Sequence, residues 1–399
     1  MIVVGGGVVG TATAWAAARN GHSALLLEQG QFGHNQGSSA GESRIIRLTY
    51  PEAHYANIMP RCYELWRLIA ETSGDNEILL TTGGLDFGPR DGKAFQTLLE
   101  TCATSGVEIE HLDAETLARR FPGMKLPPDQ LCVYSPSSGI LRASRCVAAL
   151  HRLAANMGVV LKENTRVDSV REGTLETEHV AEVDTPDGIY RARAVVLACG
   201  GWAPAVMKRD FGVIIPKRRL QPYATGVAYW KLSSEWSGKF NAERMGPIID
   251  YDPDFDMYGM GACEHPGWMK MCLHVVCSEE YAIDNMDDVE KRFGELGNRF
   301  KSKTEEVLST WLQRHFQPGV FQEPLGICHF EPCVYTMTPN EDFVIDSLGV
   351  AEAGAGRVVV VSACSGHGFK TAPVTGAAAA ALALAGDNAA VSELRLESV

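Results

Sequence analysis

The stretch MIVVGGGVVGTATAWAAARNGHSALLLEQ, residues 1–29, decides the fold. A β-branched run at residues 2–4 leads into GGGVVG (5–10), and an alanine-rich segment typical of a helix follows. A second apolar strand at residues 24–27 ends in Glu28, whose carboxylate can bind both hydroxyls of an adenosine ribose. A strand, a Gly-x-Gly-x-x-Gly turn, a helix and a second strand closed by an acid predict a βαβ unit that binds a dinucleotide.

Each position of this fingerprint has a physical role. Gly5 allows the tight turn, Gly7 lets the backbone approach a pyrophosphate, and Gly10 lets the helix pack closely on the strand. The helix N-terminus at Val8 and Val9 then faces the phosphates. The fingerprint alone does not separate NAD from FAD.

The composition is that of a globular chain. It has 399 residues, 45% of them hydrophobic and 21% charged, which suffices for two domains with sizeable cores. The formal charge of −13 argues against nucleic acid or an anionic membrane as the main partner, because both need a basic face. The longest apolar run, residues 377–385, is too short to span a bilayer and predicts a buried helix. The 11 scattered cysteines are an odd number, which is typical of free thiols in a reducing compartment.

The rest of the chain predicts a fold made of separated pieces. The apolar run 194–198 leads into Gly200-Gly201, and residues 357–386 read as a buried strand, a glycine-rich loop at 366–370 and a long helix. Residues 213–339 alternate apolar runs with many aromatics, which favours antiparallel strands. We therefore expect an α/β fold with a Rossmann-like domain and a second, mostly antiparallel substrate domain with helices, divided as 1–80, 141–212 and 340–399 against 81–140 and 213–339.

Local patterns predict further elements. Arg44 and Arg47 are three residues apart, which would place them on one face if their segment were a helix. Asp113 is a helix-start signal. The other expectations are helices at 55–73 and 145–157, a strand and turn at 79–88, a turn-rich connection at 135–144, and a strand at 159–162.

Five stretches, in this order along the chain, carry a resemblance to a known family. They are the fingerprint at 5–10, GSSAGESRIIR at 37–47, EHPGWMKMCLH at 264–274, CVYTMTPNEDFVID at 333–346 and SGHGFK at 365–370. The chain resembles the monomeric sarcosine oxidase and L-pipecolate oxidase family of FAD-dependent amine oxidases, which have a DAO-type fold. The resemblance covers essentially the whole chain. The sequences at residues 266–270 and 371–374 resemble the pipecolate oxidase branch more than the sarcosine oxidase branch.

The resemblance implies a covalently held FAD. In the family, the cysteine of a Cys-x-Tyr-Thr stretch carries the flavin through a thioether to its 8-methyl group, and Cys333 matches it. A thiolate is a suitable nucleophile for such a bond. The resemblance also places Arg44 near the flavin ring. The expected FAD-binding residues are Gly5, Gly7, Val8, Val9, Gly10, Glu28, Ser38, Ser39, Arg44, Arg47, Val167, Cys199, Gly200, Trp202, Cys333, Gly366, His367, Gly368, Phe369 and Lys370.

The resemblance also implies a substrate site. Arg47 and Lys370 match two cations that hold the substrate carboxylate. Tyr258 and Tyr335 match tyrosines of the pocket, and His274 matches a histidine beside the substrate amine.

Lys270 matches a lysine that lies near flavin N5 and activates oxygen. A fixed positive charge stabilises the superoxide that the first electron transfer to O2 produces. The chain departs from the family pattern nearby, with Met271-Cys272-Leu273 after the lysine and a bulky Trp268 before it. We expect these side chains to reshape the substrate pocket.

Together these matches imply an oxidase of a secondary α-amino acid, such as sarcosine, L-pipecolate or L-proline, that forms an imine and reduces O2 to hydrogen peroxide. The expected partners are that substrate and O2, with no nucleic acid, no membrane and no metal, since no Cys/His run has zinc spacing. Three alternatives stay open: a flavin dehydrogenase that passes electrons to a carrier, an NAD-dependent dehydrogenase, and a non-catalytic amino acid binder. Retention of Arg47, Lys270, Cys333 and Lys370 argues against the last.

The expected location and assembly come from the same resemblance. We expect a monomer in the cytoplasm or in peroxisomes. The C-terminal Glu397-Ser398-Val399 does not match the Ser-Lys-Leu peroxisomal address.

Overall fold

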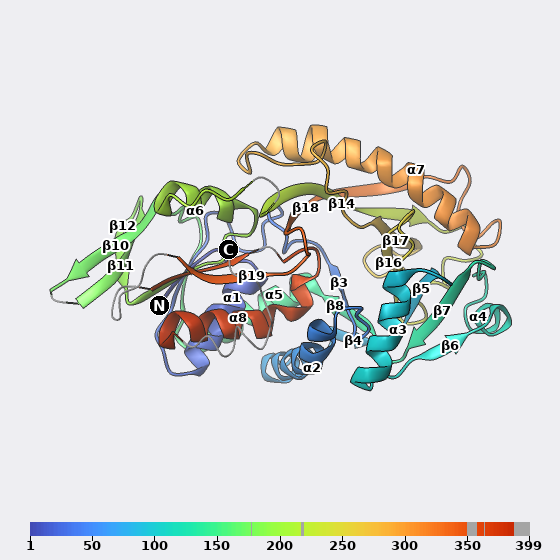
Figure 1. The fold of residues 1–399 in the computed structure, drawn as a ribbon, viewed down its shortest axis with the longest axis horizontal. Coiled ribbons are helices and arrows are strands. Elements are labelled where there is room, and N and C mark those ends of the chain that lie inside the picture. The colour runs from blue at the N-terminus through green and yellow to red at the C-terminus, as the bar shows by residue number, and fades with distance from the viewer. Residues whose placement is uncertain (177, 217–218, 349–356, 363, 387–399) are drawn as a thin grey trace.

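The computed structural model describes residues 1–176, 178–216, 219–348, 357–362 and 364–386. The C-terminal tripeptide discussed above lies outside these residues. One part of the molecule holds a sheet with α1 and α8 packed along it, and the other holds a second sheet with α7 across it (Figure 1). The α/β fold expected from the sequence is confirmed, whereas the limits of the two domains stay a prediction.

A six-stranded sheet forms the nucleotide-binding part. Its central strands are short and buried, and they are parallel, with Ile2 opposite both Leu25 and Val195. Burial on both faces explains their uninterrupted apolar sequence. Antiparallel β19 lies at one edge. The sheet confirms the predicted βαβ unit and the return of the later segments, and its order is β19 (Val344–Leu348), β20 (Arg357–Ser362), β13 (Ala194–Leu197), β1 (Ile2–Val4), β2 (Leu25–Leu27) and β9 (Val160–Lys162).

Helices pack around this sheet in one core. The small alanine side chains of α1 are buried, and they let α1 pack against both α5 and α8. Helix α8 begins at Gly368, so the last residues of the predicted 366–370 loop form its first turn. The predicted helices at 55–73, 145–157 and 377–385 are confirmed, and the four helices are α1 (Val8–Arg19), α2 (Ala53–Ser73), α5 (Ala143–Asn156) and α8 (Gly368–Ala385).

An eight-stranded sheet forms the second part. Its described pairs are antiparallel except β15 with β5, which confirms the expectation for residues 213–339. Helix α7 (Gly297–His315) covers β14, β17 and β18 and buries Leu308 and Trp311. The strand order is β18 (Ile327–Met337), β14 (Gln221–Lys231), β17 (Trp268–Leu273), β16 (Met257–Met260), β15 (Pro247–Asp250), β5 (Gly84–Pro89), β7 (Gln130–Ser135) and β6 (Glu110–Leu112).

A three-stranded sheet between the two parts settles the conformation around Arg44 and corrects one expectation. It consists of β3 (Ser43–Ile46), β8 (Gly139–Arg142) and β4 (Leu79–Thr81). Arg44 therefore lies in a strand rather than a helix, because the β-branched Ile45-Ile46 favours extended backbone and pairs with β8. The predicted turn-rich segment at 135–144 contains that same β8.

The remaining elements are small. The helix start at Asp113 is confirmed, since its Oδ1 accepts a 2.8 Å hydrogen bond from the Thr116 amide. The sequence did not predict the antiparallel sheet of β10–β12. The elements not yet named are α3 (Lys93–Ser105), α4 (Ala114–Arg120), α6 (Ala203–Phe211), β10 (Ser169–Leu175), β11 (Glu178–Thr185), β12 (Gly188–Ala192), a 3-10 turn at Gly200–Trp202 and a π-helix at Glu290–Leu296.

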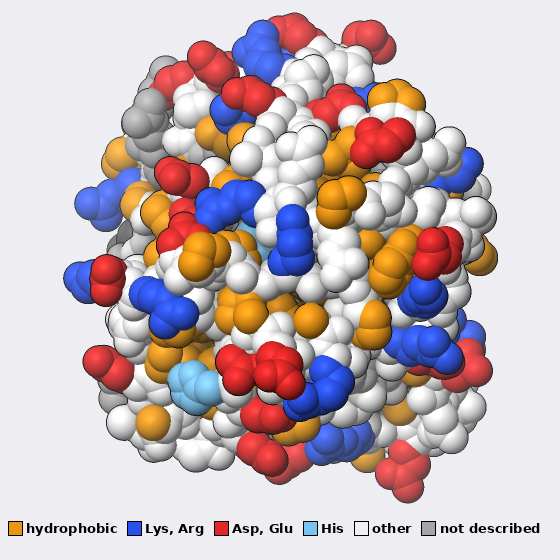
Figure 2. Space-filling model, turned by 90° about the vertical axis from the view of Figure 1, so that its right-hand side faces the viewer, with side chains coloured by type: hydrophobic (Ala, Val, Ile, Leu, Met, Phe, Trp, Pro, Cys, Tyr) orange, Lys and Arg blue, Asp and Glu red, His pale blue; other side chains and the backbone are white. Residues whose placement is uncertain are grey.

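The charged surface is mixed where Figure 2 shows it. On the face at the right-hand end of Figure 1, Lys and Arg side chains are interspersed with Asp and Glu side chains. Of the helices that the structure describes, none has the length and apolarity needed to cross a membrane.

Candidate active site

A cavity of about 640 Å³ lies where the turns after β1, β2 and β13 meet. It extends from Glu28 to the start of α8. Most of the predicted cofactor residues line it: Gly5, Gly7, Val8, Val9, Glu28, Ser38, Ser39, Arg44, Val167, Cys199, Gly200, Trp202, Gly366, Gly368 and Phe369. The other predicted cofactor residues lie elsewhere, Gly10 in the packing behind the cavity and Arg47, Cys333, His367 and Lys370 in a second cavity.

Glu28 is fixed at one end of the first cavity. The amides of Gly6 and Gly30 donate to its two carboxylate oxygens at 2.8 and 2.9 Å, and His34 Nε2 lies 3.2 Å from Oε1. Burial opposes ionisation, but the hydrogen bonds from His34, Gly30 and Gly6 lower the pKa of Glu28. The carboxylate is thus held ionised and oriented, as recognition of a pair of hydroxyl groups requires.

Gly5 and Gly10 both shape the glycine-rich turn, but only Gly5 lines the cavity. Gly5 has φ of +108°, which favours glycine. A Cβ on Gly10 would lie 2.0 Å from the Gly5 carbonyl oxygen, so helix and turn can approach this closely only without a side chain. This is the packing role that the fingerprint predicts for its third glycine.

A second cavity of about 750 Å³ adjoins the first. Five residues line both of them: Arg44, Tyr335, Ser365, Gly366 and Phe369. All six residues predicted to be catalytic line the second cavity: Arg47, Tyr258, Lys270, His274, Tyr335 and Lys370. The residues that depart from the family pattern, Trp268 and 271–273, are not among the lining residues of either cavity, so the expectation that they reshape the pocket stays a prediction of an indirect effect.

Arg47 is held from several sides. Its Nη1 donates to the Thr49 carbonyl and the Tyr251 hydroxyl, and lies 3.7 Å from Asp86 Oδ1. Its guanidinium carbon lies 4.3 Å from the centre of the Tyr50 ring. Burial raises the pKa of Asp86 to about 6, although Arg47 and the Thr49 hydroxyl act in the opposite direction. The guanidinium is therefore oriented by two phenols that keep their protons and by the Asp86 carboxyl, which is still mostly ionised at neutral pH.

Lys370 is a buried lysine near Arg47 that becomes a second cation when it is protonated. Its Nζ donates to the His367 carbonyl at 3.2 Å and lies 5.4 Å from the centre of the Tyr50 ring. Burial and the neighbouring Arg47 hold the pKa of Lys370 well below its ordinary value. An anion placed between the two side chains would favour the protonated form of Lys370.

Lys270 projects from β17 into the same cavity and is fixed by a buried cluster. Its Nζ lies 3.1 Å from both the carbonyl and the hydroxyl oxygen of Ser43, and 3.6 Å from Glu264 Oε1. The Ser43 hydroxyl in turn donates to Glu264 Oε1. Burial opposes ionisation of Glu264, but the Lys270 charge and the Ser43 hydroxyl lower the pKa of this carboxyl.

Tyr258, Tyr335 and His274 form one wall of the second cavity. The Tyr335 hydroxyl donates to the Tyr258 hydroxyl at 3.1 Å, and the His274 ring centre lies 5.7 Å from that of Tyr335. Burial raises the pKa of Tyr258 well above its ordinary value, so its hydroxyl keeps its proton at neutral pH. Gly366 packs against this wall and has φ of +75°. A Cβ on Gly366 would lie 2.7 Å from the ring of His274 and 2.7 Å from the ring of Tyr335.

Cys333 differs in position from the other cysteines at the site. It lies on β18 and lines the second cavity, whereas Cys199 and Cys364 line the first. Burial raises the pKa of Cys199 to about 12 and that of Cys364 to about 11, which makes both poor nucleophiles. All of the cysteines are free thiols.

The residues around the first cavity fit a flavin adenine dinucleotide. Glu28 offers an ionised carboxylate at one end, and the N-terminal turn of α1 offers backbone amides beside it. Toward the other end, the buried Thr336 Oγ1 lines the cavity and finds no hydrogen-bond partner among the described residues. This cofactor needs a cavity with a carboxylate for the adenosine ribose at one end, which Glu28 offers, and polar atoms for the flavin ring toward the other, where Thr336 Oγ1 lies.

The sequence did not reveal the partners that position the predicted residues. Tyr50, Asp86 and Tyr251 around Arg47 come from segments without a distinctive motif. Glu264 had a signal that we did not use, because it lies six residues before Lys270 across a Pro-Gly turn.

Comparison with known proteins identifies the family. Residues 1–382 match the family described as FAD dependent oxidoreductase (DAO). The chain belongs to this family. The match confirms the resemblance and the FAD-dependent oxidoreductase class that the motifs predict.

Individual relatives extend over nearly the whole chain. A probable sarcosine oxidase of Arabidopsis thaliana is 31% identical, over 96% of this chain and 88% of the relative. A peroxisomal sarcosine oxidase of Mus musculus is 30% identical, over 94% of this chain and 89% of the relative. The open form of NikD, an unusual amino acid oxidase essential for nikkomycin biosynthesis, has a TM-score of 0.79 at 24% identity, covers 98% of this chain and 96% of its own, and supports the fold.

Proposed function

We propose that this protein is an oxidase of secondary α-amino acids, such as sarcosine, L-pipecolate or L-proline, with FAD bound covalently and O2 as electron acceptor. At the coarser level, the chain is an FAD-dependent amine oxidase of the sarcosine oxidase type. One observation carries the finer proposal. The cavity lined by Glu28 and the glycine-rich turn shares five lining residues with the cavity that contains Arg47, Lys370 and Lys270; the shared residues are Arg44, Tyr335, Ser365, Gly366 and Phe369.

Arg47 and Lys370 bind the substrate carboxylate in this proposal. Both line the second cavity; Lys370 is buried and the Arg47 side chain is only 12% exposed, so water screens a carboxylate there less than at the surface. Arg47 is fixed by Tyr251 and Asp86 and stays charged. Lys370 gains its proton with the anion, because the anion offsets the two effects that lower its pKa.

The substrate amine then lies against the wall of Tyr258, Tyr335 and His274. The two phenols keep their protons and can bind a neutral amine by hydrogen bonds. The bound FAD supplies the redox chemistry, by accepting a hydride equivalent from the C–H next to the amine nitrogen. Because the two cavities share walls, a substrate held in the second cavity would lie beside the cofactor in the orientation that this transfer needs.

Lys270 provides a fixed positive charge for O2 in this proposal. It is buried, and the Ser43 carbonyl and hydroxyl hold its ammonium in one place. An ammonium that is already oriented stabilises negative charge developing on oxygen without reorganisation. The products are an imine and hydrogen peroxide.

Cys333 carries the flavin through a thioether in this proposal. One S–C bond replaces the thiol S–H and one C–H of the flavin methyl group, and O2 takes up the two electrons and two protons released. Among the three cysteines that line the two cavities, the high pKa values of Cys199 and Cys364 argue against those two thiols as the nucleophile. We also propose a monomeric enzyme.

A substrate screen tests the proposal. Purified protein is mixed in air with sarcosine, L-pipecolate, L-proline and the matched primary amino acids glycine and L-norleucine, and peroxide release is recorded with a peroxidase-coupled dye. We expect release with at least one secondary amino acid and a much lower rate with the primary ones. Equal rates would overturn the substrate class. Reduction of an added dye without peroxide would favour a dehydrogenase.

A further inference from the structure

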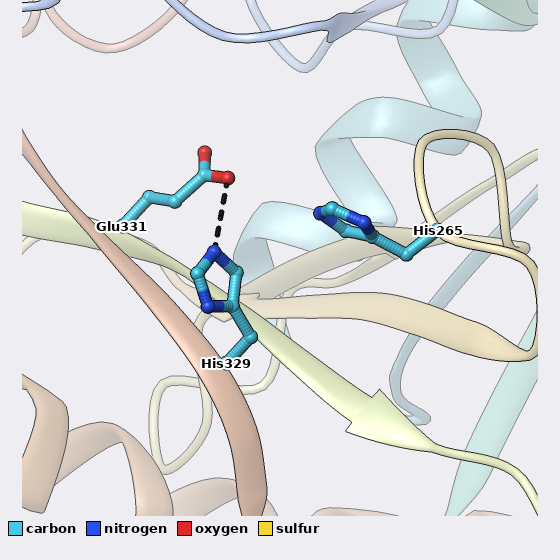
Figure 3. A group of neighbouring side chains, drawn as sticks. All are labelled: His265, His329 and Glu331. Atoms are coloured by element: carbon cyan, nitrogen blue, oxygen red, sulfur yellow. Dashed lines mark ion pairs between the residues drawn. The ribbon is translucent and has the colours of Figure 1, made fainter.

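Three side chains that are able to ligate a metal ion meet outside both cavities. His329 and Glu331 are two residues apart on β18 and therefore lie on one face of that strand. His265 approaches them from the loop between β16 and β17, as Figure 3 shows. One ring nitrogen or carboxylate oxygen from each residue lies within 4.8 Å of the other two.

The spacing is close to that of a metal site. Zinc binds histidine nitrogen and carboxylate oxygen at about 2.0–2.2 Å, which separates tetrahedral ligand atoms by about 3.3 Å. His329 Nε2 and Glu331 Oε1 are already 3.4 Å apart, the pair joined by the dashed line in Figure 3. His265 is half-buried, and its ligand nitrogen lies within 4.8 Å of the other two ligand atoms, so it must approach them by about 1.5 Å at most.

Aromatic neighbours hold the two imidazoles in place. The Tyr229 ring centre lies 4.8 Å from that of His265 and 5.6 Å from that of His329. The Trp268 ring lies 4.9 and 6.0 Å from the same two histidines. Packing of this kind limits the rotamers of both ligands, so less entropy is lost when an ion binds.

The ligands also select the type of ion. Two imidazoles and one carboxylate suit borderline transition metals, whereas Mg²⁺ and Ca²⁺ prefer oxygen ligands only. Glu331 brings negative charge, and the side chains of His329 and Glu331 are 43% and 39% exposed, so an ion can enter from solvent. Three protein ligands leave a fourth position for water.

We propose that His265, His329 and Glu331 bind one divalent transition-metal ion, with Zn²⁺ as the reference ion. The site lies beside the buried cluster of Lys270, Ser43 and Glu264 and includes none of its residues. Tyr229 is paired with Lys270 in one ladder and with His329 in the next, and His265 directly follows Glu264. The proposal does not depend on the proposed substrate or on covalent flavin.

Equilibrium dialysis of the holoenzyme with Zn²⁺ tests the site. The measurements use a Cys277→Ser/Cys328→Ser background, because these two exposed thiols could also bind zinc. We expect one saturable ion per chain. His329→Ala, His265→Ala and Glu331→Gln should each weaken binding by about tenfold or more.

A matched control and a competing ion make the result decisive. His111→Ala removes an exposed histidine from β6 of the same sheet and should leave the binding curve unchanged. Unchanged melting temperatures in EDTA show that the three ligand variants fold. Binding that survives in all three variants, no saturable binding below about 100 μM, or equal competition by Mg²⁺ would each overturn the proposal.

Discussion

Glu264 Oε1 lies 3.6 Å from Lys270 Nζ, and each of the two side chains is only 3% exposed. Ser43 joins them, since its hydroxyl lies 3.1 Å from the ammonium and donates to the carboxylate. The cation proposed to face oxygen is therefore part of a buried ion pair, and its position depends on a residue outside the reaction chemistry. Removal of one partner should have a different effect from removal of both.

The first prediction concerns stability. Lys270→Met leaves Glu264 buried without its counter-ion and should lower the free energy of unfolding by about 3–5 kcal/mol. The double variant Lys270→Met/Glu264→Gln removes both charges and should recover a large part of that loss. Urea unfolding of the four proteins of this double-mutant cycle measures the coupling. Additive losses would show that the pair is not coupled.

The second prediction concerns oxygen. Both Lys270→Met and the double variant should lower the rate at which O2 reoxidises the reduced enzyme by about 10²–10³-fold, because a preoriented charge is lost. Stopped-flow mixing of the substrate-reduced enzyme with O2 measures that rate. Lys231→Met is the matched control, since this exposed lysine ends the neighbouring strand β14. An unchanged rate in both Lys270 variants would remove Lys270 from the oxygen reaction.

The third prediction concerns pH and the carboxylate site. Burial and Arg47 lower the pKa of Lys370, so its ammonium is present below that lowered pKa and lost above it. Affinity for a carboxylate should fall as the pH rises through this range, well below the ordinary lysine value. Tetrahydrofuran-2-carboxylate is a suitable probe, because it has the shape of proline without a titrating amine. Its Kd is measured at several pH values from the change in flavin absorbance, and in Lys370→Met the Kd should no longer rise with pH in this range. A rise that persists in the variant would assign the pH dependence to another group.

How far the sequence predicts this site depends on the kind of residue. The fingerprint and Glu28 are local in the sequence, so their pattern predicted correctly the βαβ unit and the position of Glu28 at the end of its second strand. Arg47, Lys270 and Lys370 belong to short motifs, and the structure brings all three into one cavity. Tyr251 and Asp86 meet Arg47 through β15 and β5, whose pairing no local pattern encodes. The sequence left the conformation around Arg44 open, because the strand there depends on pairing with β8, which lies far away in the sequence.

The fourth prediction concerns flavin attachment. After acid precipitation, the yellow colour of wild-type protein should remain in the pellet, and that of Cys333→Ser should move to the supernatant. Cys199→Ser and Cys364→Ser are matched controls, because both thiols line the FAD cavity, and both should keep a yellow pellet. Wild-type flavin in the supernatant would rule out covalent attachment. A colourless preparation would show that the purified protein holds no flavin, and reconstitution with FAD would then have to precede this test.

The most direct test of the central claim is a single turnover followed by absorbance. The enzyme is mixed without oxygen with one equivalent of sarcosine, L-pipecolate or L-proline, and air-saturated buffer is then added. The account predicts that at least one of these secondary amino acids bleaches the flavin absorbance, and that O2 restores it with one equivalent of hydrogen peroxide. Absence of bleaching by all three, or recovery that needs an added electron carrier, would contradict the account.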